Sequence, residues 1–238
     1  MSSFPQSGAG PFPRRIFISD KQIERICRET LESCGLLPDV PGPIRIDRLI
    51  YLKFKFDEEY ADLSPHIMGC AKFTKDGIVS ILVNRELGEK SDVVSNRRVR
   101  STLAHEVGHG LLHSDLFIEK LTQEECGQLF GSEAETCDSV TKEGFACRAE
   151  DGIHEVRAFE WWEYQANLAM ASLLLPWNLV RVTAGQHLNY VLGGSGDMDS
   201  RIAQAEQEIG EVFDVNRRMV SIRLGKWWKQ EVTQPSLL

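Results

Sequence analysis

The feature that most constrains the fold is a five-residue run in the middle of the chain, His105-Glu106-Val107-Gly108-His109. It lies in a window, from about Ser95 to His113, where apolar residues recur at the spacing of one buried helix face. Four residues advance a helix by about 400° and 6 Å, so both imidazoles project from one side and can share a tetrahedral Zn²⁺. Glu106 is rotated by about 100° from His105, which places its carboxylate as a general base rather than a ligand. The run therefore predicts a zinc-binding helix.

A catalytic zinc site needs a third protein ligand and keeps its fourth position for water. In metzincins the third ligand is a histidine that follows a glycine, but Leu112 and Asp115 occupy the corresponding positions here. The metzincin arrangement is therefore excluded, and the third ligand must come from elsewhere in the chain.

A second predicted helix, from about Ala158 to Leu175, supplies the candidates for the third ligand. Glu160 and Glu163 both lie near its start, and a glutamate completes the zinc site in thermolysin-like enzymes. Asn167 lies one turn after Glu163 and can orient a ligating histidine through its free ring nitrogen. Glu163 is therefore the predicted ligand, with Glu160 as the alternative.

Two stretches of the chain resemble the ImmA/IrrE family of zinc metallo-endopeptidases. They are RSTLAHEVGHGLLH at Arg100–His113 and EYQANLAMASLLLP at Glu163–Pro176, and with the flanking elements the resemblance covers roughly residues 45–228. It implies a Zn²⁺ site formed by His105, His109 and Glu163, with Glu106 as the catalytic base. It also implies a protein substrate, such as a helix-turn-helix transcriptional repressor whose cleavage relieves repression. The interval between the two motifs is longer than in compact members of the family, which leaves the identity of the substrate open.

A β-hairpin is predicted upstream of the first motif. The runs Ile67–Thr74 and Ile78–Asn84 are rich in β-forming residues, and the Asp76-Gly77 pair between them is a strong turn signal. A small antiparallel sheet packed on the two ligand helices gives an α+β fold with a zincin-like metallopeptidase domain.

Composition divides the chain into segments. Residues 1–19 are rich in Gly, Pro and Ser and predict a disordered leader. The zincin-like domain is expected at residues 20–185, with an irregular insertion at 114–155 that contains one short helix, Glu124–Phe130. A glycine-rich linker at 186–199 and a helix-turn-helix-like C-terminal region at 200–238 complete the prediction.

The two ends of the folded part are predicted to be helical. At the N-terminal end, Asp20 is the expected N-cap of a helix from Lys21 to Cys34. At the C-terminal end, Ser200–Phe213 and Arg217–Trp228 form a helix pair. From Arg201 onwards six Lys/Arg accompany five Asp/Glu, a balance of +1 that argues against direct DNA binding.

Four further features carry weaker predictions. His113 is expected at the helix end, beside the site rather than among the ligands. Trp161 and Trp162 are expected in the core or in the wall of the cleft, and a solvated helix face is predicted for Arg97, Arg98 and Arg100. The remaining group reads as loop thiols rather than a second zinc site, because it lacks any Cys-x-x-Cys pair: Cys126, Cys137, Cys147 and His154.

Overall composition indicates the setting in which the protein works. The net charge is −8 and the sequence pI is about 5.3, which gives no electrostatic footprint for nucleic acid or an anionic membrane. No stretch reaches the roughly 20 apolar residues of a membrane helix, and the N-terminus lacks a secretory signal. The sequence therefore predicts a cytoplasmic protein, without a membrane partner, whose six cysteines are free thiols.

The rival hypothesis is a zinc-containing regulator or partner-binding protein without peptidase activity. A purely structural zinc has no use for a glutamate beside its first ligand. The combination of ligands and base therefore favours the enzyme.

Overall fold

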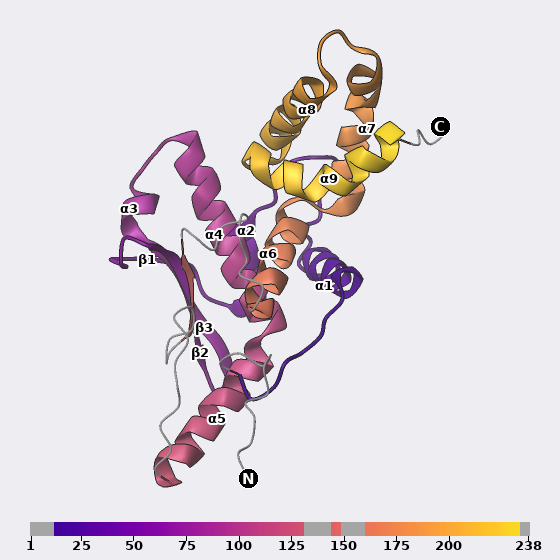
Figure 1. Cartoon of the computed structure of the whole chain (residues 1–238). Coiled ribbons are helices and arrows are strands. Elements are labelled where there is room, and N and C mark those ends of the chain that lie inside the picture. Colours follow the sequence, from indigo (N-terminus) through magenta and orange to yellow (C-terminus); the bar gives the residue numbers. More distant parts are fainter. Residues whose placement is uncertain (1–11, 131–143, 149–159, 234–238) are drawn as a thin grey trace.

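The computed structural model describes residues 12–130, 144–148 and 160–233, which form a mixed α+β fold (Figure 1). Its helices are α1 (Asp20–Ser33), α2 (Ile46–Phe54), α3 (Arg85–Gly88), α4 (Val93–Leu112), α5 (Ser114–Phe130), α6 (Trp161–Leu174), α7 (Trp177–Gly193), α8 (Met198–Phe213) and α9 (Arg217–Thr233). Its strands are β1 (Glu59–Ala61), β2 (Ile67–Thr74), β3 (Gly77–Asn84) and β4 (Gly144–Arg148).

The sheet is mixed and has the strand order β1-β3-β2-β4 within the described residues. The predicted hairpin is confirmed, because β2 and β3 pair antiparallel from Gly69↔Val83 to Thr74↔Gly77. Gly77 adopts a φ of 110°, which explains why glycine occupies the turn. The prediction of a purely antiparallel sheet is wrong, since β1 runs parallel to β3 at one edge.

Helix α4 is the central element of the fold. It lies between the sheet and α6 (Figure 1), packing against β2 and β3 on one side and against α6 on the other, while α1 covers the far side of α6. On the apolar face that the sequence predicted, Leu103 and Val107 are buried, while Val99 and Leu111 are partly buried against the same core. The same hydrophobic cluster extends through α7, α8 and α9, so the C-terminal helices share the core.

The prediction of an irregular insertion at 114–155 is wrong for two segments that the structure describes, although the short helix predicted at Glu124–Phe130 does lie within a helix. Ser114–Phe130 forms the whole of α5, and Gly144–Arg148 forms β4, which pairs antiparallel with β2. Leu116 and Phe117 are buried, and the Phe117 ring stacks on Phe73 of β2 at a centroid distance of 4.9 Å. This helix depends on contacts with the sheet rather than on a regular apolar repeat, which is why the sequence pattern missed it.

The segment before α1 is folded against the rest of the protein from Phe12 onwards. Phe12, expected in a disordered leader, is 4% exposed and packs against the buried Trp161 and Trp162 at centroid distances of 5.9 and 5.6 Å. The N-cap of α1 is Ser19 rather than the predicted Asp20, because the backbone N–H of Ser19 donates to Oε1 of Gln22 at 2.9 Å in a capping box.

The predicted linker at 186–199 begins inside α7, which continues to Gly193. The guanidinium of Arg201 on α8 holds the backbone of the glycine-rich segment after α7 in place. It donates to the carbonyl oxygens of Val191 at 2.9 Å and Gly196 at 2.6 Å, and also to that of Gly194.

The prediction of a solvated arginine face on α4 is wrong for two of its three residues. Arg97 Nε donates to Asp214 Oδ1 at 2.9 Å, and Arg100 pairs with the other carboxylate oxygen of Asp214 while donating to the carbonyl of Ile44 at 3.0 Å. Arg98 is exposed as expected. Asp214 lies in the turn between α8 and α9, so these ion pairs bind the C-terminal helix pair to α4.

Among the described residues, no single helix has the length and apolar character of a membrane span. Helices α6 and α7 reach that threshold only when taken together, and they are bent by 65°. The bend falls at Pro176, where the sequence predicted that α6 would stop.

Gly108 sets the distance between α4 and α6. A Cβ atom on Gly108 would lie 3.0 Å from the carbonyl oxygen of Ala166 and 3.1 Å from Cβ of Ala169, both on α6. We expect Gly108→Ala to destabilise the protein by about 1–3 kcal/mol, because the extra methyl group must push the helices apart. Urea denaturation measures this change.

Gly185→Ala is the matched control for this substitution. Gly185 also lies within a helix, α7, and a Cβ there would meet no atom within 4 Å. Alanine should leave this site neutral or stabilise it by up to about 1 kcal/mol through helix propensity. Equal free energies of unfolding for the two variants would show that the packing of α6 against α4 does not require a glycine at position 108.

Candidate metal centre

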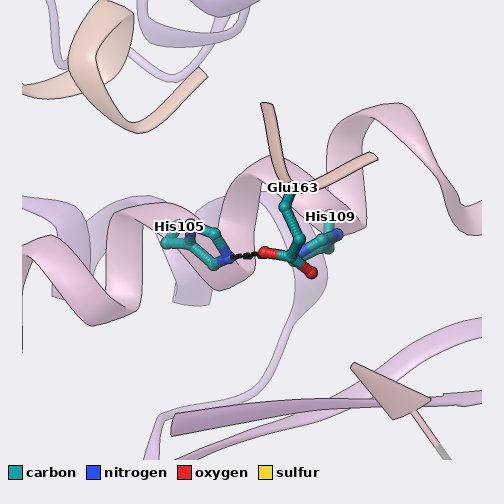
Figure 2. Close-up of side chains that lie close together, drawn as sticks. All are labelled: His105, His109 and Glu163. Carbon is teal, nitrogen blue, oxygen red and sulfur yellow. Dashed lines mark hydrogen bonds and ion pairs between the residues drawn. The ribbon is translucent and has the colours of Figure 1, made fainter. Parts of the chain in front are cut away.

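Three side chains from two helices converge at the point where α4 and α6 pack together. His105 Nε2 lies 3.0 Å from His109 Nε2 and 3.0 Å from Glu163 Oε2, while His109 Nε2 lies 3.5 Å from Glu163 Oε1. Figure 2 shows the two rings on one side of α4 with the carboxylate of Glu163 between them. Ligands at 2.0–2.1 Å from a tetrahedral Zn²⁺ are about 3.4 Å apart. The two nitrogens and the carboxylate group are therefore close enough together to hold one ion.

The third position is filled by Glu163 rather than by Glu160. Glu163 lies in the first turn of α6 and is 1% exposed, whereas Glu160 is the N-cap residue of that helix. Among the described residues, the group that could hold a metal ion consists of His105, His109 and Glu163. The structure thus assembles the predicted set and leaves out the alternative.

Asn167 orients His105 as the sequence predicted. Its Oδ1 lies 3.0 Å from His105 Nδ1. An amide oxygen can only accept a hydrogen bond, so His105 Nδ1 carries a proton. In the neutral ring, Nε2 then has a lone pair directed at the metal position.

His113 lies beside the site but outside the ligand group, in agreement with the prediction. Its Nδ1 is 3.0 Å from Nδ1 of His109, and its Nε2 is 2.9 Å from Oε1 of Gln165. Burial, together with the neighbouring His109, lowers the pKa of His113 to about 3. This ring is therefore uncharged at neutral pH.

The electrostatics of the cluster favour a cation. Burial lowers the pKa of His105, but the hydrogen bond and the negative charge of Glu163 outweigh it and raise that pKa to about 9. Burial also opposes ionisation of Glu163, yet His109 and His105 hold its pKa well below the usual range. Without a metal, a proton on His105 occupies the place of positive charge beside the carboxylate.

Glu106 lies between α4 and the sheet and is fully buried. A Cβ on Gly69 of β2 would lie 3.4 Å from Glu106 Oε1 and 2.4 Å from Cγ2 of Thr102. The absence of a side chain at Gly69 therefore makes room for the methyl group of Thr102, and the Glu106 carboxylate lies beside the same backbone position. Glu106 is not among the metal-binding group, as expected for a base rather than a ligand.

Two participants were not predicted from the sequence. Gln165 lies within the second motif, but nothing in its spacing indicates a contact with His113. Gly69 is distant in the chain from its neighbours Thr102 and Glu106 on α4. Both act through contacts between segments that are distant in the chain. The cysteine group of the sequence analysis could not be compared, since its side chains at 126, 137 and 147 and residue 154 lie outside the described residues.

Removal of the Glu163 carboxylate should abolish tight zinc binding. We expect Glu163→Gln to weaken the affinity by more than about 10²-fold, because loss of an outer hydrogen-bond partner alone costs 10–100-fold. Competition with a chromophoric chelator measures the affinity. Glu160→Gln, the matched control, should bind zinc like the wild type, and the reverse pattern would make Glu160 the ligand.

Zinc binding should release a proton even at a pH well above the usual pKa of histidine. The pKa of His105 is raised from 6.5 to about 9, so the ring is protonated at pH 8 in the metal-free protein and must lose its proton to bind a metal. Calorimetry at pH 8 in buffers of different ionisation enthalpy should therefore show release of about one proton, and the affinity should fall about tenfold per pH unit below this pKa. Proton release close to zero at pH 8 would contradict the proposed pairing of His105 with Glu163.

Comparison with known proteins does not extend this assignment. Neither the scan against protein-family models nor the search of curated proteins gives a match. The resemblance to the ImmA/IrrE family therefore stays a prediction, and the metal centre rests on the geometry of the chain itself.

Proposed function

We propose that the protein is a zinc-dependent metallo-endopeptidase of the ImmA/IrrE type, with a zincin-like domain and a helix-turn-helix-like C-terminal region. One observation carries the proposal. Two imidazole nitrogens and a carboxylate converge within 3.0–3.5 Å of one another, and the residue after the first histidine is a buried glutamate. This is the donor set and base of a hydrolytic zinc site.

The residues fit Zn²⁺ better than a harder cation. Two histidine nitrogens and one carboxylate are typical of zinc, whereas Mg²⁺ and Ca²⁺ prefer sites made of oxygen ligands. The distances of 3.0 Å from His105 Nε2 to His109 Nε2 and to Glu163 Oε2 also suit the ligands of a tetrahedral ion. His105, His109 and Glu163 would hold it, leaving one position for water or substrate.

In the proposed hydrolysis each side chain of the site has a separate role. When bound, zinc supplies Lewis acidity, which lowers the pKa of water and polarises the scissile carbonyl. Glu106 then accepts the proton of the attacking water and delivers it to the departing amine. Asn167 holds the ring of His105 in place through Nδ1 while this proceeds.

The proposed substrate is a protein in the cytoplasm, such as a helix-turn-helix repressor. Support comes from the two sequence motifs and from the C-terminal helices. Helices α8 and α9 are joined by a short turn and packed against each other, as a partner-docking element would be. Direct DNA binding is not part of the proposal, because this region carries a charge of only about +1.

The burial of the site favours a second candidate function. The three ligands and Glu106 are at most 2% exposed, and a closed site is typical of structural zinc. In this alternative the ion fastens α4 to α6 in a regulator that cleaves nothing. Hydrolysis instead requires that the site open to the substrate.

The substitution Glu106→Gln separates the two functions. It keeps the side-chain volume and removes the proton acceptor, so zinc content and thermal stability should stay near wild type, while cleavage falls by about 10²–10⁴. The assay mixes the protein with the repressor encoded beside it or copurifying with it, and follows peptide-bond cleavage by mass spectrometry.

Glu160→Gln is the control and should cleave like the wild type. If Glu106→Gln cleaves at the wild-type rate, Glu106 is not the base. A wild-type protein that cleaves nothing and holds zinc with four protein ligands would establish the regulator instead.

A further inference from the structure

His109 is linked to the N-terminal segment by a chain of hydrogen bonds. Gln165 Nε2 donates to the carbonyl oxygen of Ile16 at 3.3 Å, and Gln165 Oε1 lies 2.9 Å from His113 Nε2. His113 Nδ1 in turn lies 3.0 Å from His109 Nδ1. The chain thus runs from the backbone before α1, through α6, to the end of α4.

The chain has only one consistent direction. A backbone carbonyl can only accept, so the amide nitrogen of Gln165 faces Ile16 and its oxygen faces His113. That oxygen also accepts, so His113 Nε2 carries a proton, and His113 Nδ1 faces Nδ1 of His109. Ligation of a metal through Nε2 of His109 puts the proton of that ring on Nδ1, which then donates to the lone pair of His113 Nδ1.

The outer end of the chain is fixed by the segment 12–16, here termed the N-terminal strap. Phe12 packs edge-on against Trp162, and Arg14 Nε donates to Glu119 Oε2 on α5 at 3.0 Å. Trp161 lies between the strap and His113, with its ring 5.9 Å from both the Phe12 ring and the imidazole. The strap is thus packed against the same α6 turn that carries Gln165.

We propose that His113 is a positioning residue of the metal centre and that the N-terminal strap is its outermost part. The chain from Ile16 through Gln165 and His113 holds His109 in the one tautomer that can ligate. His105 obtains the same orientation from Asn167. The inference rests on the metal centre of the proposed function and not on peptidase activity.

The decisive test compares two substitutions of similar shape, His113→Asn and His113→Leu, whose side chains both branch at Cγ. Both remove the ring and its packing against Trp161, but Asn keeps an acceptor near the position of Nδ1. We expect His113→Leu to weaken zinc affinity 10–100-fold, the usual effect of losing such a partner, and His113→Asn to recover most of it. The full-length protein is titrated with Zn²⁺ against a chelator, and nitrogen chemical shifts of His109 report its tautomer.

A second substitution tests the remote end of the chain. Gln165→Met keeps the length of the side chain and removes both of its hydrogen bonds, without touching His109. It should weaken zinc affinity in the same direction as His113→Leu but by less, and His109 should show a mixture of tautomers.

The outcomes distinguish this proposal from the proposed function. Equal zinc affinity in His113→Asn and His113→Leu would overturn the positioning role, because the acceptor would then make no difference. Wild-type affinity in Gln165→Met would overturn the link to the strap. A wild type that binds zinc through His109 Nε2 but cleaves no protein would refute the peptidase and leave the hydrogen-bond chain intact.

Discussion

The close approach of α4 and α6 is the constraint on which the rest of the structure depends. Gly108 allows it, because the backbone and methyl groups of Ala166 and Ala169 occupy the space where its side chain would lie. At this separation Glu163 reaches both histidines of α4. The spacing of the motif on α4 supplies two ligands, but only small residues at the helix contact bring in the third.

The same helix contact brings electron-rich groups of α4 and α6 together in a buried site. Two lone pairs and a carboxylate lie within 3.5 Å of one another in a site with no more than 2% exposure, where their mutual repulsion is poorly screened. A cation or a proton must compensate it. An ion held here would bind the folded arrangement and not the unfolded chain, so its affinity would add directly to the stability of the α4–α6 pair. Metal binding and folding would then be coupled.

The parts of the fold that the sequence predicted are those encoded locally. The helix of His105, the hairpin around Gly77 and the role of Asn167 follow from spacings of a few residues. Helix α5, the parallel pairing of β1 and the burial of Phe12 depend instead on segments far apart in the chain. Gln165 belongs to this second group, because no local pattern tells that its partners are Ile16 and His113.

The C-terminal helices are held to α4 by charge as well as by the shared core. Asp214 adopts a left-handed backbone conformation in the turn before α9, with a φ of 51°, and burial disfavours its charge while Arg97 and Arg100 lower its pKa. Its side chain is 39% exposed, so each ion pair contributes at most about 1 kcal/mol. Arg100 also donates a hydrogen bond to the carbonyl oxygen of Ile44, just before α2. This arginine therefore connects the turn between α8 and α9 both to α4 and to the segment before α2. Helices α8 and α9 are therefore not an independent appendage. A partner that binds them would contact a unit that is joined directly to α4, the helix that carries both histidines.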